Sequence, residues 1–193
     1  MKQTLPPGKL LQRKSIHFAT ALIPLYYYFT HDAKTVKWLT FILAAGFLSA
    51  DLLRLKFALA RKIFLNIFGS MLKVAETRKK LTGATMLFIG MAATVFLFKE
   101  KQAVPALLFV CLADPLAAIF GQLYAKNVFW EKSLEGSAAF YLTASAVILI
   151  FTSFSWWGLV VALIVTVLEL MPINIDDNLL IPVVTAFLLG IRI

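Results

Sequence analysis

The stretch that decides the fold class reads VPALLFVCLADPLAAIFGQLY and covers residues 104–124. Only Asp114 and Gln122 interrupt its apolar character, and a helix needs about 20 such residues to cross a bilayer. Similar stretches recur at residues 17–29, 36–53, 81–98, 137–154, 156–172 and 179–193. The sequence therefore predicts an all-α, polytopic membrane helix bundle with about seven transmembrane helices. Six spans and a re-entrant segment are the alternative.

The composition of the whole chain agrees with a membrane protein. Of its 193 residues, 61% are hydrophobic and 15% are charged, and the mean hydropathy is +0.85. Soluble domains have about 45–50% apolar and about 25% charged residues, so an ordinary soluble domain is excluded. The single cysteine, Cys111, excludes an intrachain disulfide. We interpret the net charge of +9 as contact with membrane lipids and phosphates, not nucleic acid.

The basic residues are unevenly divided between the two sides of the predicted bundle. Of the 19 Lys and Arg residues, about fourteen fall on one side and about five on the other. Basic loops stay in the cytoplasm, so we expect a cytoplasmic N-terminus and an outer C-terminus in the cytoplasmic (inner) membrane. Residues 57–74 are too polar for a span, but their apolar residues recur at helical spacing. We predict an amphipathic interfacial helix there, or a helix packed on the bundle.

Asp114 is the most unusual residue of the predicted spans. A carboxylate inside a membrane is costly and usually functional, and Pro115 beside it should kink the helix and free carbonyl groups. On a helix, Ala117, Ala118 and Gly121 share the face of Asp114. Small residues there leave room for a ligand, or they let two helices pack closely. The carboxylate favours the ligand, since Mg²⁺ binds one or two carboxylates together with phosphate oxygens.

Three other groups of polar residues are predicted at the same cytoplasmic side. Lys132 and Ser133 stand before a predicted helix, where a phosphate or only a cap would fit. Glu169, Asp177 and Asn178 belong to an acidic group that suits a second metal contact, a ribose contact or a polar turn. The third group consists of His17 and Asp51. His17 is a base or an interfacial anchor, and Asp51 can form an ion pair with Arg54. No P-loop motif is present in the sequence.

Together these residues resemble the CTP-dependent lipid kinase family that includes dolichol kinase, phytol kinase and yeast-type diacylglycerol kinase. The resemblance covers nearly the whole chain and rests on six segments. They are residues 13–17, residues 50–54, residues 81–84, Asp114 with Ala117, Ala118 and Gly121, residues 132–137, and Asp177-Asn178 with Pro182. Ala113 and Ala125 depart from the family pattern, which often has glycine before the equivalents of Asp114 and Lys126. The shortness of the chain favours a prokaryotic polyprenol- or phytol-kinase-like member.

The resemblance implies an enzyme that transfers the γ-phosphate of CTP to a membrane lipid alcohol such as a polyprenol, phytol or diacylglycerol. Residues 1–193 would form one integral membrane catalytic domain that faces the cytoplasm and uses Mg²⁺. The implied catalytic residues are His17, Asp51, Asp114 and Lys132, and the implied metal ligands are Asp114, Glu169 and Asp177. The implied nucleotide-binding residues are Thr82, Gly83, Ala117, Ala118, Gly121, Lys126, Lys132, Ser133, Glu135, Gly136 and Asn178.

Two other functions fit parts of the sequence. The first is a cytidylyltransferase that makes a CDP-lipid from a lipid phosphate, although the long C-terminal signature of the known phosphatidate enzymes is absent. The second is a small transporter with Asp114 as its ion site. A transporter needs polar groups that reach both faces, and the outer half of this chain has few. We therefore rank both below the kinase.

Overall fold

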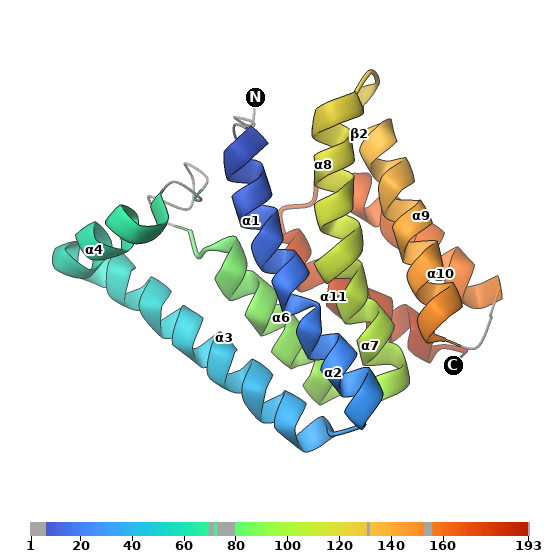
Figure 1. Ribbon diagram of the computed structural model, residues 1–193, viewed down its shortest axis with the longest axis horizontal. Helices are drawn as coiled ribbons and strands as arrows, with labels where there is room; N and C mark the ends of the chain where they lie inside the picture. The colour runs from blue at the N-terminus through green and yellow to red at the C-terminus, as the bar shows by residue number, and fades with distance from the viewer. Residues whose placement is uncertain (1–6, 70–71, 73–79, 131, 153–155, 193) are drawn as a thin grey trace.

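The computed structural model describes residues 7–69, 72, 80–130, 132–152 and 156–192. Within these residues most of the chain is helical, which confirms the predicted all-α class. The helices run back and forth between two ends of the molecule, with the N-terminus near the upper end of Figure 1 and the C-terminus near the lower end. Two short strands, β1 (Val128–Phe129) and β2 (Lys132–Ser133), form an antiparallel hairpin.

Each predicted apolar stretch lies on one helix or on consecutive helices, apart from a few residues at some stretch ends. In chain order the described helices, including α4 outside these stretches, are α1 (Pro7–Thr20), α2 (Leu22–Thr30), α3 (Ala33–Lys56), α4 (Ala58–Phe68), α6 (Gly83–Leu97), α7 (Glu100–Leu108), the π-helical turn η2 (Phe109–Ala113), α8 (Asp114–Tyr124), α9 (Leu134–Phe151), α10 (Trp156–Leu170) and α11 (Asp177–Gly190).

Among the described residues, three helical segments are long and apolar enough to cross a membrane. They are Ala33–Lys56, Glu100–Tyr124 and Leu134–Phe151. The apolar helices Gly83–Leu97, Trp156–Leu170 and Asp177–Gly190 are shorter. At about 1.5 Å per residue they extend about 21–23 Å, against a hydrocarbon core of about 30 Å. A total of seven transmembrane helices therefore stays a prediction.

The continuous helix formed by α7, η2 and α8 lies at the centre of the bundle. Leu107, Leu108 and Phe109 are fully buried in it. Helices α1, α2, α9 and α11 pack around this central helix. The ring of Phe109 packs edge to face against the ring of Phe140 on α9, with 6.2 Å between the ring centroids. The middle of the sequence thus provides the surface on which both halves of the chain assemble.

The first helix begins earlier than the apolar pattern predicts. The pattern places the first span from residue 17, whereas α1 already starts at Pro7, a residue type favoured in the first helical turn. The helix is interrupted at Ala21, which separates α1 from α2. Pro24 has no N–H group for the carbonyl of Thr20, so a regular helix cannot continue through this point. Lys9, Arg13 and Lys14, which precede the predicted span, therefore belong to a helix of the bundle.

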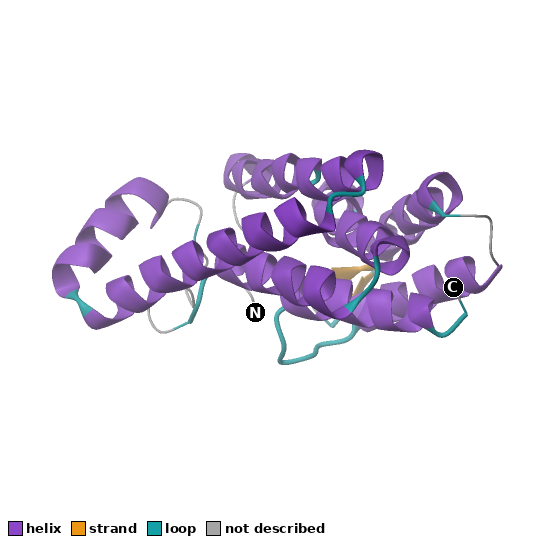
Figure 2. Ribbon diagram, turned by 90° about the horizontal axis from the view of Figure 1, so that it is seen from below, coloured by secondary structure: helices purple, strands orange, loops and turns teal. Residues whose placement is uncertain are grey.

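Helix α4 is the described part of the predicted amphipathic segment 57–74. It packs against α3 and has no buried residue. Figure 2 shows this helix projecting from the rest of the bundle. Residues 70, 71, 73 and 74 of the predicted segment lie outside the described residues. The existence of a separate helix is confirmed, while its place at a membrane surface stays a prediction.

Candidate functional site

The π-helical turn before Asp114 is a local consequence of Pro115. In this turn the N–H group of Asp114 donates to the carbonyl of Phe109, five residues back. The same pattern would pair residue 115 with the carbonyl of Val110, but proline has no N–H group. The Val110 carbonyl instead accepts from Nδ1 of His17, at 3.3 Å. The kink predicted at Pro115 thus takes the form of a π-turn, and its freed carbonyl holds the histidine of α1.

Asp114, Lys14 and His17 form a buried cluster between α1 and α8. The Nζ atom of Lys14 lies 2.5 Å from Oδ2 of Asp114, and Nδ1 of His17 lies 3.6 Å from the same oxygen. All three residues are more than nine-tenths buried. The carboxylate therefore has a lysine as its direct counter-ion and an imidazole beside it.

Because its Nδ1 proton is directed to the Val110 carbonyl, the ring of His17 has a defined tautomer. In the neutral ring this leaves Nε2 as the basic nitrogen. His17 was predicted from the sequence, but Lys14 was not singled out. Its only signal was a position three residues before His17, which puts both side chains on one face of a helix.

A second, partly buried cluster joins Lys132 of β2 to two acidic residues. Its Nζ atom lies 2.7 Å from Oε1 of Glu169 on α10 and 2.9 Å from Oδ2 of Asp177 on α11. It also donates to the backbone carbonyl of Glu169. Burial alone would lower the pKa of Lys132, but the charges of Glu169 and Asp177 outweigh burial and raise it above its ordinary value. Lys132 is therefore a cation at neutral pH.

The two clusters are electrostatic neighbours. The charges of Lys132 and Glu169 both act on Asp114, although neither makes an ion pair with it. The clusters draw on α1, α8, α10, α11 and β2, which come from both ends of the sequence; Figure 1 shows α1 and α8 side by side. The structure therefore brings together Asp114, Lys132, Glu169 and Asp177, which the sequence predicted as site residues.

The small residues after Asp114 pack against α9. A methyl group added at Gly121 would lie 2.9 Å from Oγ of Ser133, and one at Gly136 would lie 2.7 Å from the carbonyl oxygen of Ala117. Ala117 is 5% exposed. The face that we expected to leave room for a ligand is thus filled by α9 at Ala117 and Gly121, as in other close helix crossings. Ala118, on the same helix, is only partly buried.

Gly136 provides a direct test of this crossing. Replacing Gly136 with alanine is expected to lower the free energy of unfolding by about 2 kcal/mol, because the new methyl group overlaps the backbone of α8. The matched control is Gly46→Ala, because a methyl group at Gly46 has no atom within 4 Å. Thermal unfolding in detergent measures both. Equal stability of the two variants would contradict the close crossing.

Ser133 and Glu135 hold the loop between α8 and α9. The Oγ atom of Ser133 accepts from the backbone N–H of Gly136, which confirms the predicted helix cap. Glu135 Oε1 accepts from the backbone N–H groups of Lys126 and Asn127. The side chain of Lys126 is exposed. Among the described residues, Oε2 of Glu135 and Oγ of Ser137 are buried without a hydrogen-bond partner.

Asp51 belongs to a separate network between α3 and the start of α6. Its Oδ1 atom accepts from Nε of Arg54 at 2.5 Å. Its Oδ2 atom accepts from the Thr82 backbone N–H at 2.6 Å and from Oγ1 of Thr85 at 2.6 Å. Both carboxylate oxygens are thus engaged, and Asp51 is 1% exposed. This arrangement favours a structural role for Asp51 over the catalytic role that the resemblance implied.

Gly83 and Asn178 connect this network to α11. The Nδ2 atom of Asn178 donates to the carbonyl of Gly83 at 3.2 Å. A methyl group at Gly83 would also collide with the guanidinium of Arg13 on α1. The predicted nucleotide-binding residues Gly83 and Asn178 are therefore in mutual contact, next to the helix that carries Lys14 and His17.

The predicted metal ligands do not form a ready-made metal site. Within the described residues there is no group of three or more His, Cys, Asp or Glu side chains that could hold a metal ion. Asp114 is paired with Lys14, while Glu169 and Asp177 share Lys132. This donor set fits Mg²⁺ that arrives with phosphate oxygens, since such an ion needs only one or two carboxylates from the protein.

The fold and these clusters define an all-helical protein with helices long and apolar enough to cross a membrane. No family model and no solved structure matches the chain. It is 30% identical over 140 residues to the uncharacterized protein MJ1137 of Methanocaldococcus jannaschii, across 70% of this chain and 72% of that protein. The chain belongs to the same family as that archaeal protein.

A second relative is bacterial. The chain is 26% identical over 135 residues to the uncharacterized protein RP860 of Rickettsia prowazekii. The match covers 69% of this chain and 66% of that protein, just under two thirds of its length. The name of neither relative states an activity.

Proposed function

We propose that this protein is a CTP-dependent lipid kinase that transfers the γ-phosphate of CTP to the hydroxyl group of a membrane lipid alcohol. The observation that carries the proposal is the pair of neighbouring clusters among apolar helices, one buried around Asp114 and one partly buried around Lys132. Buried charges of this kind are costly in a bundle that needs only to pack. A nucleoside triphosphate and a magnesium ion would provide partners for the charged side chains of both clusters.

The lysines of the two clusters are the groups that would bind phosphate. In the structure, Lys14 and Lys132 are paired with carboxylates. Phosphate oxygens offer each ammonium group an equivalent partner, so the lysines can change from carboxylate to phosphate when CTP binds. Asp114 and Asp177 are then free to hold Mg²⁺, with Glu169 next to them. The ion would neutralise charge on the transferred phosphoryl group.

His17 is the general base in this proposal. The hydrogen bond of Nδ1 to the Val110 carbonyl leaves Nε2 to accept the proton of the lipid hydroxyl. The lipid oxygen forms a bond to the γ-phosphorus, the bond from that phosphorus to the β-phosphate oxygen breaks, and CDP leaves. Asp114 beside the ring stabilises the imidazolium that results.

The unpaired groups near Ser133 support a place for the nucleoside. Glu135 has a free Oε2 atom, and Ser137 has a hydroxyl group without a partner among the described residues. Both lie in the first turn of α9, next to the capped helix N-terminus that favours anions. Ribose hydroxyl groups would satisfy the carboxylate of Glu135.

We place the enzyme in the cytoplasmic membrane with its site towards the cytoplasm. Support comes from the excess of basic residues on the side of the N-terminus. The N- and C-termini lie near opposite ends of the molecule, as an odd number of membrane crossings would require. The large exposed apolar side chains of α3, among them Trp38, Phe41 and Ile42, suit contact with lipid.

The test is nucleotide turnover by the purified protein in mixed micelles with Mg²⁺. Each of the four nucleoside triphosphates is combined with phytol, a polyprenol, diacylglycerol or phosphatidate. We expect CDP and a phosphorylated alcohol, with CTP preferred over the other donors. Release of pyrophosphate with phosphatidate would identify a cytidylyltransferase instead, and no turnover with any pair would contradict both enzymatic functions.

A further inference from the structure

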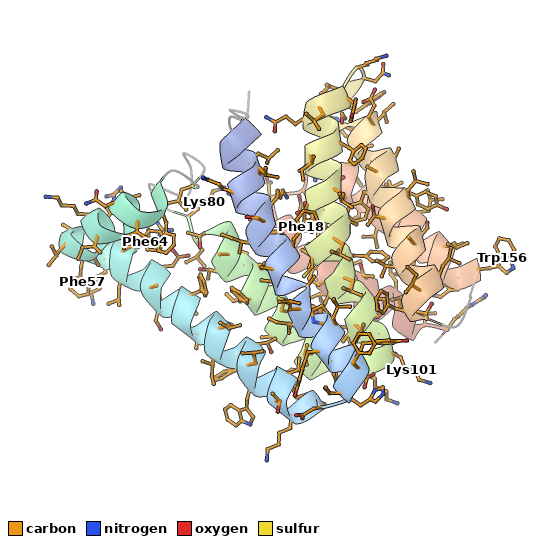
Figure 3. All side chains as sticks on the ribbon, viewed as in Figure 1. Phe18, Phe57, Phe64, Lys80, Lys101 and Trp156 are labelled. Carbon is orange, nitrogen blue, oxygen red and sulfur yellow. The ribbon has the colours of Figure 1, made fainter. Side chains whose placement is uncertain are left out.

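The corner between α3 and α4 lies apart from the two charged clusters. Figure 3 places Phe57 at this corner and Phe64 on α4. Helix α4 leaves the bundle here and, among the described residues, packs mainly against α3. The proposed kinase site uses none of its residues.

The corner is held in one geometry by Arg54. This residue is 1% exposed, and its Nε atom lies 2.5 Å from Oδ1 of Asp51. One of its terminal nitrogens donates to the carbonyl of Lys80 at 2.8 Å, and its guanidinium lies 5.1 Å from the centre of the Phe64 ring. The guanidinium thus ties α4 to α3 and to the residues before α6.

A cavity of about 500 Å³ lies in the corner, within the usual range for small-molecule sites. Its basic lining residues are Arg54, Lys56, Arg61 and Lys62, and none of the described residues that line it is acidic. Leu65 and Asn66 of α4 complete the same side. The cavity is therefore chemically suited to an anion larger than a simple ion.

Another side of α4 is apolar and exposed. Leu59, Ile63 and Ile67 recur every four residues and are 72%, 54% and 61% exposed. The helix thus has one basic side that lines a cavity and one apolar side without cover from the described residues of the bundle. This is the pattern of a helix that lies at a membrane surface, with its apolar side in the acyl region and its basic side at the level of the headgroups.

We propose that the α3–α4 corner binds the phosphate headgroup of an anionic phospholipid. The apolar stripe holds α4 at the membrane surface, and the basic cavity then opens at headgroup depth. Juxtamembrane Lys and Arg residues are attracted to anionic lipids for the same electrostatic reason. The site is independent of the proposed transfer of phosphate, since Asp114 and Lys132 play no part in it.

The test is native mass spectrometry of the full chain in detergent with phosphatidylglycerol, phosphatidic acid or phosphatidylcholine. The variant replaces Lys56, Arg61 and Lys62 with glutamine; the control replaces Lys34, Lys99 and Lys101, three exposed lysines near the other end of the molecule. Both variants lose the same charge. We expect the natural sequence to bind one anionic lipid. The affinity for that lipid should fall at least about tenfold in the cavity variant and stay unchanged in the control variant.

Three outcomes would overturn the proposal. They are equal binding of anionic lipids and phosphatidylcholine by the natural sequence, an equal loss of binding in the control variant, and displacement of the lipid by inorganic phosphate or CTP. The last outcome would make the cavity a site for soluble anions. Because CTP turnover is measured separately, a failure here leaves the kinase proposal unaffected.

Discussion

Replacing Lys132 with methionine is expected to lower the rate of phosphate transfer by about a hundredfold to a thousandfold. The substitution keeps most of the length of the side chain but removes the cation that Glu169 and Asp177 share. No other cation then neutralises the phosphate oxygens at that position. CTP turnover in mixed micelles measures the loss.

The same substitution is expected to lower the free energy of unfolding by about 2 kcal/mol. Two carboxylates would be left facing each other, yet 28% of the Lys132 side chain is exposed, so the effect is smaller than for a fully buried pair. Lys101→Met is the control, since Lys101 is an exposed lysine outside the site. A stable Lys132→Met variant with full turnover would contradict the assigned role.

The double variant Lys132→Met with Glu169→Gln separates the two effects. It removes one positive and one negative charge, so we expect much of the lost stability to return. The turnover should stay low, because the phosphate-binding cation is still absent. Recovery of both stability and turnover would show that Lys132 only neutralises the carboxylates.

Much of the fold could be predicted because membrane helices carry a simple signal. The stretch 104–124 was predicted as a span, and the structure has a helical segment over Glu100–Tyr124. The predicted cap at Ser133 is also present. The early start of α1 was missed because its residues are polar and basic, and hydropathy cannot distinguish such a helix from a loop. The buried side chains of Lys14 and His17 on this helix face the carboxylate of Asp114.

The site could be predicted in part, and the missing part has a physical cause. Asp114 and Lys132 stood out as charged residues in or beside apolar stretches. Their partners did not, because Lys14 lies 100 residues from Asp114 and looked like one of many topology-setting charges. Small residues gave an ambiguous signal as well, since Gly121 and Gly136 look the same whether they admit a ligand or another helix. Only the three-dimensional packing decides between these uses.

Replacing Asp114 with asparagine is expected to lower the rate of phosphate transfer by about a thousandfold. Asparagine has nearly the same shape but no charge, so it cannot fill the two roles proposed for the carboxylate, which are to hold Mg²⁺ and to stabilise the His17 imidazolium. The control is Glu100→Gln, which removes an acidic residue at the other end of the same helical segment, where it pairs with His31. This control should keep its turnover.

The single variant also leaves Lys14 as a buried cation without its counter-ion, so its folding could fail for reasons unrelated to catalysis. The double variant Asp114→Asn with Lys14→Met removes both charges of the pair. Replacing a buried ion pair by uncharged groups is often neutral for stability, whereas removal of one partner costs about 3–5 kcal/mol. We therefore expect the double variant to unfold near the temperature of the natural protein and to remain inactive. A stable double variant that still phosphorylates the lipid would show that Asp114 serves only to neutralise Lys14, and the proposed metal site would be wrong.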